Sequence, residues 1–275
     1  MRWHGRVRAH AAKKRAALLL LSTAASLGSA AKPRCRLFVE SRIAQGARVQ
    51  LSDAQQHYLL SVMRVRDREP VLLFDGISGE WLATVDHTGR RTCASTPLEQ
   101  TRPQDGPTLA VSLHFALLKP KRLALLVEKA TELGVHALQP LVTARTVVRE
   151  VSLDKLRATA VEAAEQCGRL SVPLVLPPLT GVEACLHSAR GAVGSHVFAC
   201  DERPECTIRL DDALAAAAAS GPLRAAAFVV GPEGGFAPDE FALLRGGAQL
   251  VSLGPNVLRS ETAALSALSI MHMRM

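Results

Sequence analysis

The chain has 275 residues, of which 48% are hydrophobic, and this length and composition suit two modest domains with cores of their own. Its formal net charge of +8 suggests a nucleic-acid partner, but residues 1–39 carry nine Lys and Arg and no Asp or Glu. The rest of the chain has 24 basic against 25 acidic side chains, which excludes a uniformly basic folded body. Any contact with nucleic acid must therefore come from local basic clusters.

Residues 1–33 are predicted to be an organellar transit peptide, for a chloroplast or a mitochondrion. The segment is rich in Arg and Ala, contains Ser and lacks acidic residues, as such peptides do. Its apolar stretch, residues 16–21, is too short to span a membrane. A secretory signal peptide is the alternative, because SLGSAA resembles a small-residue cleavage site, but the long basic run before it favours an organelle.

Residues 34–103 are predicted to form a small β-barrel. Four short runs have the composition of strands and are separated by Gly, Asp and Pro, namely RLFV, RVQL, PVLLFDG and EWLATVDH. A helical piece is expected over residues 52–65; within it His57 and Arg64 could touch RNA, although a lone His is more often an ordinary packed or surface residue. Residues 100–108 are polar, contain two Pro and one Gly, and are the expected linker.

From residue 104 onward the sequence predicts an α/β domain with a parallel sheet, because apolar strands alternate with amphipathic helices. The first helix, expected over residues 121–133, stops at Gly134. Strands are expected near residues 109–118, 136–143, 172–178, 195–201, 225–231 and 249–254.

The six cysteines form no CxxC pair and no finger spacing, so no metal site is expected. Scattered through a chain with enough core, they are expected to be buried thiols in a reducing compartment.

Two strands near the C-terminus each run into a Gly-Pro loop, residues 231–235 and 254–256, and each loop precedes a helix. Parallel strands joined by crossovers bring such loops to one edge of a sheet, where ligands of open α/β sheets bind. The first loop contains Glu233 and no Lys, so it is a poor phosphate cradle and suggests a ligand without phosphates. No GxGxxG follows a strand, which argues against a nucleotide-dependent oxidoreductase. The alternative for either loop is a simple tight turn.

The motifs GPEGGF and LGPNVLRSETAAL, residues 231–236 and 253–265, resemble the C-terminal signature of the 16S rRNA uracil-N3 methyltransferases, a branch of the trefoil-knotted SPOUT superfamily. Further segments resemble the same family in the same order, and the match covers about residues 36–270. These segments are residues 57–65, 71–85, 117–135, 140–148 and 162–173.

The resemblance implies a PUA-like RNA-binding barrel at residues 34–103 and a knotted SPOUT methyltransferase domain at residues 104–275. It also implies S-adenosylmethionine as cofactor, small-subunit ribosomal RNA or a 30S-type particle as partner, no membrane, and a homodimer. The residues expected to bind the cofactor lie in or after the two loops: Gly231, Pro232, Glu233, Gly234, Gly235, Leu253, Gly254, Asn256, Val257, Leu258, Thr262 and Ala263.

Methylation at uracil N3 requires the N3 proton to leave and the resulting charge on O2 and O4 to be stabilised. Arg259 is the first catalytic candidate, because its planar donor fork could bind that charge; the alternative is an Arg that grips a phosphate or forms a surface salt bridge. Glu261 could orient Arg259 or accept the proton, or could simply be a first-turn carboxylate favoured by the helix dipole. Ser260 is expected to be an N-cap.

Other basic residues are candidates for RNA binding. Lys119, Lys121 and Arg122 lie where a strand becomes a helix, at the edge expected to face ligand, and suit phosphate contacts. A solvated basic helix start is the alternative. Arg145 and Thr146 follow the next strand, and Arg169 closes a later helix, where a positive charge also favours the helix dipole.

The chain departs from the family pattern at residues 67–70, where Asp-Arg-Glu-Pro stands in place of a common Gly-Asp. Residues 180–224 match only loosely, so the resemblance leaves cofactor contacts near Cys200 and Asp201 open. Two other functions remain open. One is a SPOUT methyltransferase acting on a ribose 2′-OH or another base. The other is a non-catalytic RNA-binding protein.

Overall fold

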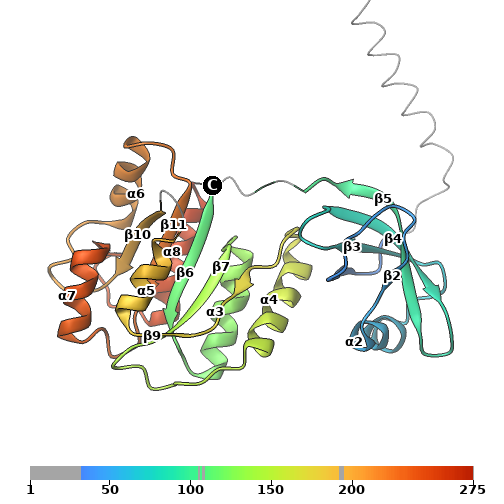
Figure 1. Ribbon diagram of the computed structural model, residues 1–275, viewed down its shortest axis with the longest axis horizontal. Coiled ribbons are helices and arrows are strands. Elements are labelled where there is room, and N and C mark those ends of the chain that lie inside the picture. The colour runs from blue at the N-terminus through green and yellow to red at the C-terminus, as the bar shows by residue number, and fades with distance from the viewer. Residues whose placement is uncertain (1–31, 105, 107–108, 192–194, 275) are drawn as a thin grey trace, which may run out of the picture.

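A computed structural model describes residues 32–104, 106, 109–191 and 195–274, so the expected transit peptide lies almost entirely outside the described residues. The described chain forms two sheets, each with its own buried core (Figure 1). None of the helices in this part of the chain is long and apolar enough to cross a membrane.

The N-terminal sheet is curled and has five strands in the order β1-β3-β4-β5-β2 (Figure 1). Only β1 and β3 pair in parallel; the other pairs are antiparallel. The strands are β1 (Arg36–Phe38), β2 (Val49–Gln50), β3 (Pro70–Phe74), β4 (Glu80–His87) and β5 (Cys93–Arg102). The sequence did not predict β5, because its second half is polar and exposed and gives no alternating pattern. The link to the next domain therefore starts after Arg102.

The helical piece of this domain is shorter than the predicted 52–65. Helix α2 (Asp53–His57) begins with a capping box formed by Ser52 and Gln55. It continues as a π-helical turn, η2 (Tyr58–Val62), which ends before Arg64. Arg64 has a φ of 51°, a left-handed conformation that stops a helix.

The second sheet is parallel throughout and has the strand order β12-β10-β11-β6-β7-β8, with β9 also paired to β7. This confirms the predicted α/β class and all six predicted strands to within a few residues. The strands are β6 (Ala110–Ala116), β7 (Ala137–Val142), β8 (Leu174–Val175), β9 (Leu179–Thr180), β10 (Ser195–Cys200), β11 (Ala225–Val230) and β12 (Gln249–Val251).

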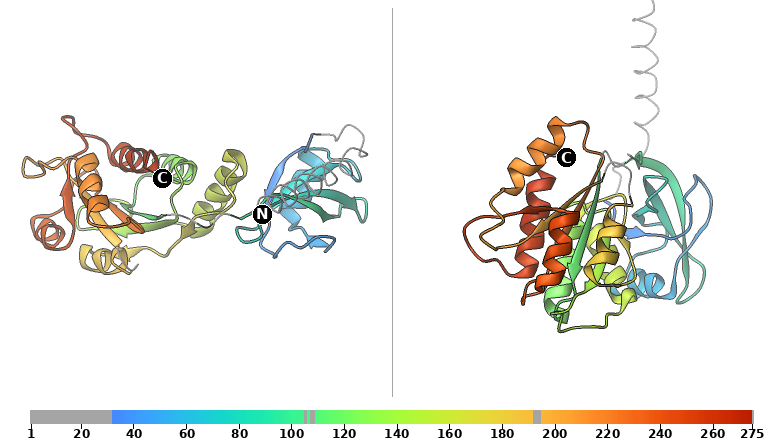
Figure 2. Two further views of the ribbon diagram at one scale, coloured as in Figure 1. Left: turned by 90° about the horizontal axis from the view of Figure 1, so that it is seen from above. Right: turned by 60° about the vertical axis from the view of Figure 1, so that its left-hand side comes forward.

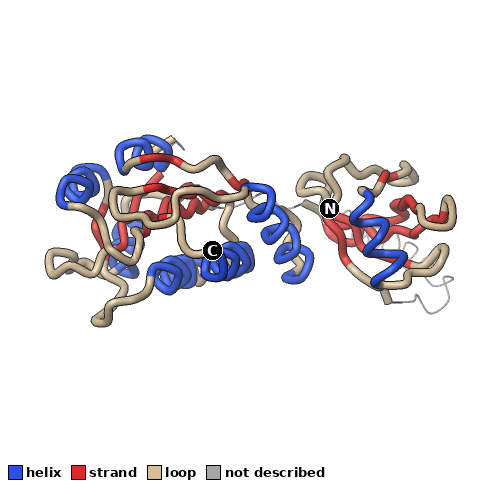
Figure 3. The backbone as a smooth tube through the Cα atoms, turned by 90° about the horizontal axis from the view of Figure 1, so that it is seen from below, coloured by secondary structure: helices blue, strands red, loops and turns tan. Residues whose placement is uncertain are grey.

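Helices cover both faces of this sheet (Figure 3). On one face lie α3 (Pro120–Glu132), α4 (Leu153–Cys167), α6 (Leu210–Ala219) and α8 (Ser260–His272); on the other lie α5 (Val182–Ala189) and α7 (Pro238–Gly247). The central strand β11 is entirely buried, with Phe228 packed in the first core and its neighbours Ala227 and Val229 in the second. This alternation explains why the strand reads as a continuous apolar run.

Arg36 joins the two domains. Its Nε pairs with the Glu80 carboxylate at 2.6 Å within the first domain, while its two terminal nitrogens donate to the carbonyls of Ala164 and Arg169 at 2.7 and 2.6 Å. The Phe38 amide also donates to Glu165, a carboxyl whose pKa is raised by burial. These contacts fix the C-terminal end of α4, the helix on the side that faces the first domain (Figure 2).

Candidate active site

Three adjacent parallel strands, β10, β11 and β12, end at one edge of the second sheet. The segments that leave them are residues 201–209, 231–237 and 252–259. The expectation that both Gly-Pro loops meet at one edge is therefore confirmed. The segment after β10 joins them there.

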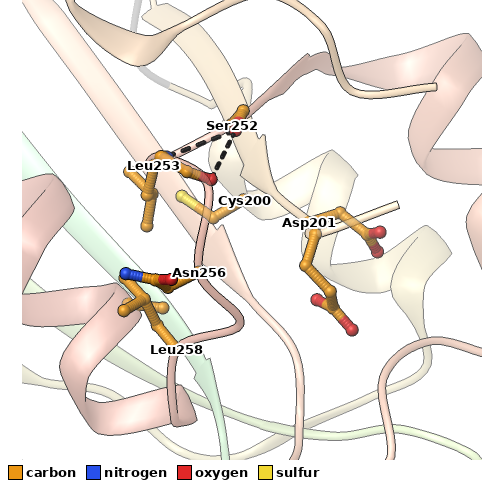
Figure 4. Close-up of a pocket in the computed structure, with 9 residues that line it drawn as sticks. Cys200, Asp201, Ser252, Leu253, Asn256 and Leu258 are labelled. Atoms are coloured by element: carbon orange, nitrogen blue, oxygen red, sulfur yellow. Dashed lines mark hydrogen bonds between the residues drawn. The ribbon is translucent and has the colours of Figure 1, made fainter. Parts of the chain in front are cut away.

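A pocket lies between the segments after β10 and β12. Its lining includes five residues expected to bind a cofactor, Leu253, Gly254, Asn256, Leu258 and Ala263, and four that were not expected, Cys200, Asp201, Glu202 and Ser252. Figure 4 shows Asp201 on the opposite side of Cys200 from Asn256 and Leu258. No lysine or arginine is among these nine lining residues.

The second Gly-Pro loop has a conformation that requires glycine. Gly254 has a φ of 131°, and the Ser252 hydroxyl bonds both its amide and its carbonyl oxygen at 3.3 Å. A Cβ added to Gly254 would meet no atom within 4 Å, so a side chain there would project into open space beside the pocket. Burial raises the pKa of the Cys200 thiol to about 12, which keeps this part of the lining uncharged at neutral pH.

The first Gly-Pro loop lies beside this pocket but does not line it. The Ser260 hydroxyl donates to the Gly231 carbonyl at 2.6 Å, so the expected N-cap residue instead ties the start of α8 to the first loop. A Cβ on Gly231 would lie 2.9 Å from the Phe236 ring, and Gly235 turns the chain with a φ of 65°. Both glycines are therefore needed for the shape of the loop.

Arg122 connects the first loop with α8. Its Nη1 pairs with Glu233 at 3.0 Å, and its Nε lies 3.5 Å from Glu261. The expectation from sequence placed Arg122 on a phosphate of RNA. In the structure its guanidinium bridges Glu233 of the first Gly-Pro loop and Glu261 of α8, and its contact with RNA stays a prediction.

Glu261 is 8% exposed, and its second oxygen, Oε2, is buried without a hydrogen-bond partner among the described residues. A buried acceptor left unpaired is unfavourable, which suggests that a ligand supplies its donor. Arg259 is exposed, and no ion pair or hydrogen bond joins its side chain to another described residue. Glu261 is thus held by Arg122, and Arg259 is free to contact a substrate.

The loop after β7 packs against the first Gly-Pro loop. Arg145 donates to the Gly234 carbonyl at 2.9 Å, while Glu240 accepts from the amides of Ala144 and Ala237. Thr146 is buried, and its hydroxyl is bonded within the loop to Thr143. Both residues expected to bind substrate after this strand therefore support the loop; Arg145 remains exposed as well.

The remaining predicted RNA contacts divide into two kinds. Lys119 and Lys121 are exposed at the start of α3, as phosphate contacts require. Arg169 is half-buried and donates to the Thr131 carbonyl at 3.0 Å and to Ser171 at 3.2 Å. Its role in RNA binding stays a prediction, because these contacts already give it a structural one.

The sequence left contacts near Cys200 and Asp201 open, and the structure places this segment at the pocket. Asp201, Glu202 and Arg203 follow a strand whose position was predicted, so their place at the ligand edge could have been inferred from topology alone. They carry no motif, and the match to the family is loose there. Among the described residues no group of His, Cys, Asp and Glu is arranged to hold a metal ion.

Comparison with known proteins gives the same picture for both domains. Residues 105–272 match the family model of an RNA methyltransferase domain, and residues 51–98 match that of an RNA methyltransferase PUA domain. The chain is 31% identical over 240 residues to the ribosomal RNA small subunit methyltransferase E of Rickettsia conorii, covering 85% of this chain and 93% of that protein. It is 33% identical to the enzyme of the same name from Synechocystis, covering 81% and 72%.

Two solved structures are similar over 87% of this chain and 97% of their own. One is a ribosomal RNA small subunit methyltransferase E from Neisseria gonorrhoeae bound to S-adenosylmethionine, with 29% identity and a TM-score of 0.74. The other is a putative methyltransferase from Legionella pneumophila in complex with the same cofactor, with 25% identity and a TM-score of 0.75.

Proposed function

Because the chain belongs to the RNA methyltransferase family that includes the ribosomal RNA small subunit methyltransferases E, we propose that it methylates N3 of a specific uridine in small-subunit, 16S-type ribosomal RNA, with S-adenosylmethionine as methyl donor. The observation that carries this proposal is the pocket between the segments after β10 and β12, at the edge where the first Gly-Pro loop and the Glu261 carboxylate also lie.

The residues present fit this cofactor. Leu253, Leu258 and Ala263 offer apolar surface to a purine, and Gly254 leaves open space where any other residue would place a side chain. Two carboxylates and no lysine or arginine line the pocket, which suits a ligand with a positive sulfonium and no phosphates. The remaining predicted cofactor residues, Gly231 to Gly235, Val257 and Thr262, would complete the site from the adjoining loop and helix.

When bound, the cofactor would supply an electrophilic methyl group for transfer to uracil N3. The protein must unstack the uridine, because N3 lies on the Watson–Crick edge of the base. Arg259, exposed beside the pocket, would stabilise the negative charge that spreads to O2 and O4 as the N3 proton leaves. Glu261 has a free buried oxygen that can accept a proton or a hydrogen bond, and Arg122 orients it.

The RNA would approach across Lys119 and Lys121 at the start of α3, with Arg145 at the first Gly-Pro loop and the PUA-like domain, residues 34–103, as further contacts. Residues 104–275 would form the methyltransferase domain. Arg122, Thr146 and Arg169 would act on the RNA indirectly, through the loops and helices that they hold. We also propose a homodimer, a transit peptide over residues 1–33, and action in a chloroplast or mitochondrion.

The test is methylation of small-subunit RNA by the purified protein, with the modified nucleoside identified by mass spectrometry. The proposal expects 3-methyluridine at one position, formed only when S-adenosylmethionine is present. Detection of a 2′-O-methylated nucleoside or of another methylated base would refute methylation at N3 and assign that other activity to the protein. Cofactor-independent RNA binding without any methylation would point to a non-catalytic protein. A chain lacking roughly the first thirty residues should remain active, because this part of the sequence has the basic, acid-free composition of a transit peptide.

A further inference from the structure

The segment after β10 contributes Asp201, a residue with a buried side chain, to the lining of the cofactor pocket. The Asp201 side chain is only 3% exposed, although the residue lines the pocket. Its Oδ1 accepts the amide of Arg203 at 3.0 Å and lies 3.7 Å from the Nε of that residue. No hydrogen bond from a described residue reaches Oδ2, so this oxygen can accept one from a ligand.

Arg203 fixes this carboxylate and the first Gly-Pro loop together. Its Nη2 donates to the Phe236 carbonyl, the last residue of GPEGGF, at 2.6 Å. Its guanidinium also stacks over the Phe241 ring of α7 at 3.9 Å from the centroid. One side chain therefore sets the distance between the segment after β10 and the loop after β11.

Building on the proposed function, we propose that Asp201 binds the ribose hydroxyls of S-adenosylmethionine and that Arg203 is the positioning residue that holds Asp201 at the pocket. Vicinal hydroxyls are two neutral donors, and a carboxylate is an acceptor-only group with sites on both oxygens. Such charge-assisted hydrogen bonds are among the stronger ones in proteins.

The surroundings favour the ribose over the other donors of the cofactor. Leu253, Leu258 and Ala263 supply the apolar lining that a purine requires, on the segment facing Asp201. The amino-acid end of the cofactor carries a carboxylate next to its ammonium group, so Asp201 and Glu202 would repel one of its charges while attracting the other. Burial raises the pKa of the Asp201 carboxyl, and the backbone amide and charge of Arg203 oppose that shift.

The first test measures binding by calorimetry for three ligands: S-adenosylmethionine, S-adenosylhomocysteine and 5′-methylthioadenosine. All three carry the ribose, only the first carries the sulfonium, and the last lacks the amino-acid end. Asp201→Asn keeps the shape of the side chain and should weaken all three by a similar factor of about 10 to 100. Glu205→Gln, an exposed acid of the same segment outside the pocket, is the matched control and should bind all three normally.

The outcomes separate this inference from the proposed function. If the wild-type protein binds none of the three ligands, the proposed function fails. If the wild type binds and Asp201→Asn binds equally well, only the role of Asp201 is refuted. If Asp201→Asn lost affinity only for S-adenosylmethionine, Asp201 would be assigned to the sulfonium. If it kept its affinity only for 5′-methylthioadenosine, Asp201 would be assigned to the amino-acid end. Either result overturns the ribose assignment.

A second measurement tests the positioning role of Arg203. Arg203→Ala should raise the KM for the cofactor several-fold and leave kcat at saturating cofactor within about threefold, because Arg203 does not touch the RNA or the transferred methyl group. Arg203→Lys keeps the charge but loses the planar fork, and should recover only part of the affinity. Arg209→Ala, an exposed arginine paired with Asp211 in the same segment, should change neither constant. An unchanged KM in a folded Arg203→Ala protein would refute the positioning role.

Discussion

At the scale of single residues, the structure separates arginines that are free to meet a substrate from those that are already bound within the protein. Arg259 is exposed and unpaired among the described residues, whereas Arg122, Arg145, Arg169 and Arg203 each bond a carboxylate, a backbone carbonyl or both. These bonds decide which role each arginine can take. Position in the sequence does not reveal them.

Arg259→Lys keeps the positive charge and loses the planar donor fork. If Arg259 stabilises the developing charge on uracil, the single-turnover rate of methyl transfer at saturating RNA and cofactor should fall by roughly 10²–10³. Both affinities, measured separately, should stay within a few-fold, because the interaction is strongest in the transition state. A near-normal single-turnover rate together with weakened RNA binding would instead show that Arg259 binds a phosphate of the RNA.

Lys121→Ala and Arg122→Ala change neighbouring residues with different surroundings. Lys121 is exposed, so its loss should weaken RNA binding and lower the magnitude of the salt slope by about one. Arg122 pairs with Glu233 and Glu261, so its loss should weaken cofactor binding and leave the salt slope almost unchanged. Titrations of RNA and cofactor at several salt concentrations separate the two roles. If both variants lowered the salt slope of RNA binding by the same amount, Arg122 would be assigned to the RNA.

His114, on the central strand β6, links stability to pH. The residue is 2% exposed, and burial lowers its pKa from 6.5 to about 4. The unfolded chain therefore binds the proton first as pH falls, so the stability that depends on neutral His114 is present above pH 6.5 and is lost between about pH 6.5 and 4. The loss can reach roughly 3 kcal/mol.

Denaturant unfolding of the wild type and His114→Gln at several pH values tests this linkage. The variant should be less stable at pH 7.5, and its stability should fall less steeply between pH 6.5 and 4.5. His136→Gln, at an exposed position, should keep the wild-type slope. Parallel curves for wild type and His114→Gln would contradict the assignment of this proton to His114.

At the scale of elements, the site is made by where strands end. Strands β10, β11 and β12 are short and parallel, and each is followed by a segment whose shape depends on a few residues. Gly254 supplies a positive φ after β12, and Arg203 anchors the segment after β10. The strands position the segments, and the segments carry the chemistry.

Gly254→Ala should lower the affinity for S-adenosylmethionine, because φ 131° is unfavourable for alanine and the new methyl group would enter the space beside the pocket. Gly221→Ala is the matched control. Gly221 has a φ of 152° and equally open surroundings, but it lies before β11, away from the carboxyl edge of the sheet. Both variants should lose comparable stability in thermal melts, and only Gly254→Ala should lose cofactor affinity in calorimetry. Equal cofactor affinity in the two would remove the second Gly-Pro loop from the site.

At the scale of the whole molecule, the contacts of Arg36 make the N-terminal domain part of one assembly with the methyltransferase domain. The Arg36 side chain is 10% exposed and that of Glu80 is 7%, so this ion pair is shielded from solvent next to the boundary between domains. The ion pair of Arg157 with Glu40 does join the two domains, and its side chains are 58% and 79% exposed.

Arg36→Ala should destabilise the protein by roughly 3–5 kcal/mol, because it leaves Glu80 buried with its main partner removed. Arg157→Ala breaks the exposed ion pair across the same boundary and should change the stability by less than about 1 kcal/mol. Adding Glu80→Gln to Arg36→Ala should restore part of the loss, since no unpaired charge then remains. Similar effects of the two single changes in denaturant unfolding would show that burial of the Arg36 pair does not matter to stability.

The sequence by itself determined the α/β class of the second domain and the approximate positions of six of its strands, because apolar runs alternate with amphipathic helices; the two-residue strand β9 was not predicted. The parallel order of β11 and β12 followed from strand–helix–strand spacing, and with it the meeting of the two Gly-Pro loops. Motif resemblance added the family and the cofactor; the knot also came from resemblance and stays a prediction.

Only the tertiary structure decided which residues share the site. Arg122 and Glu261 are 139 positions apart, and Arg203 and Phe236 are 33 apart, so their contacts leave no periodic or local signal. Strand β5 escaped prediction for a similar reason, since its exposed half is held by pairing with β4. Local sequence patterns indicate which helix or strand a residue belongs to and which of its faces is buried. Ion pairs and pocket walls depend on how separate elements pack, and that packing is settled by the whole chain at once.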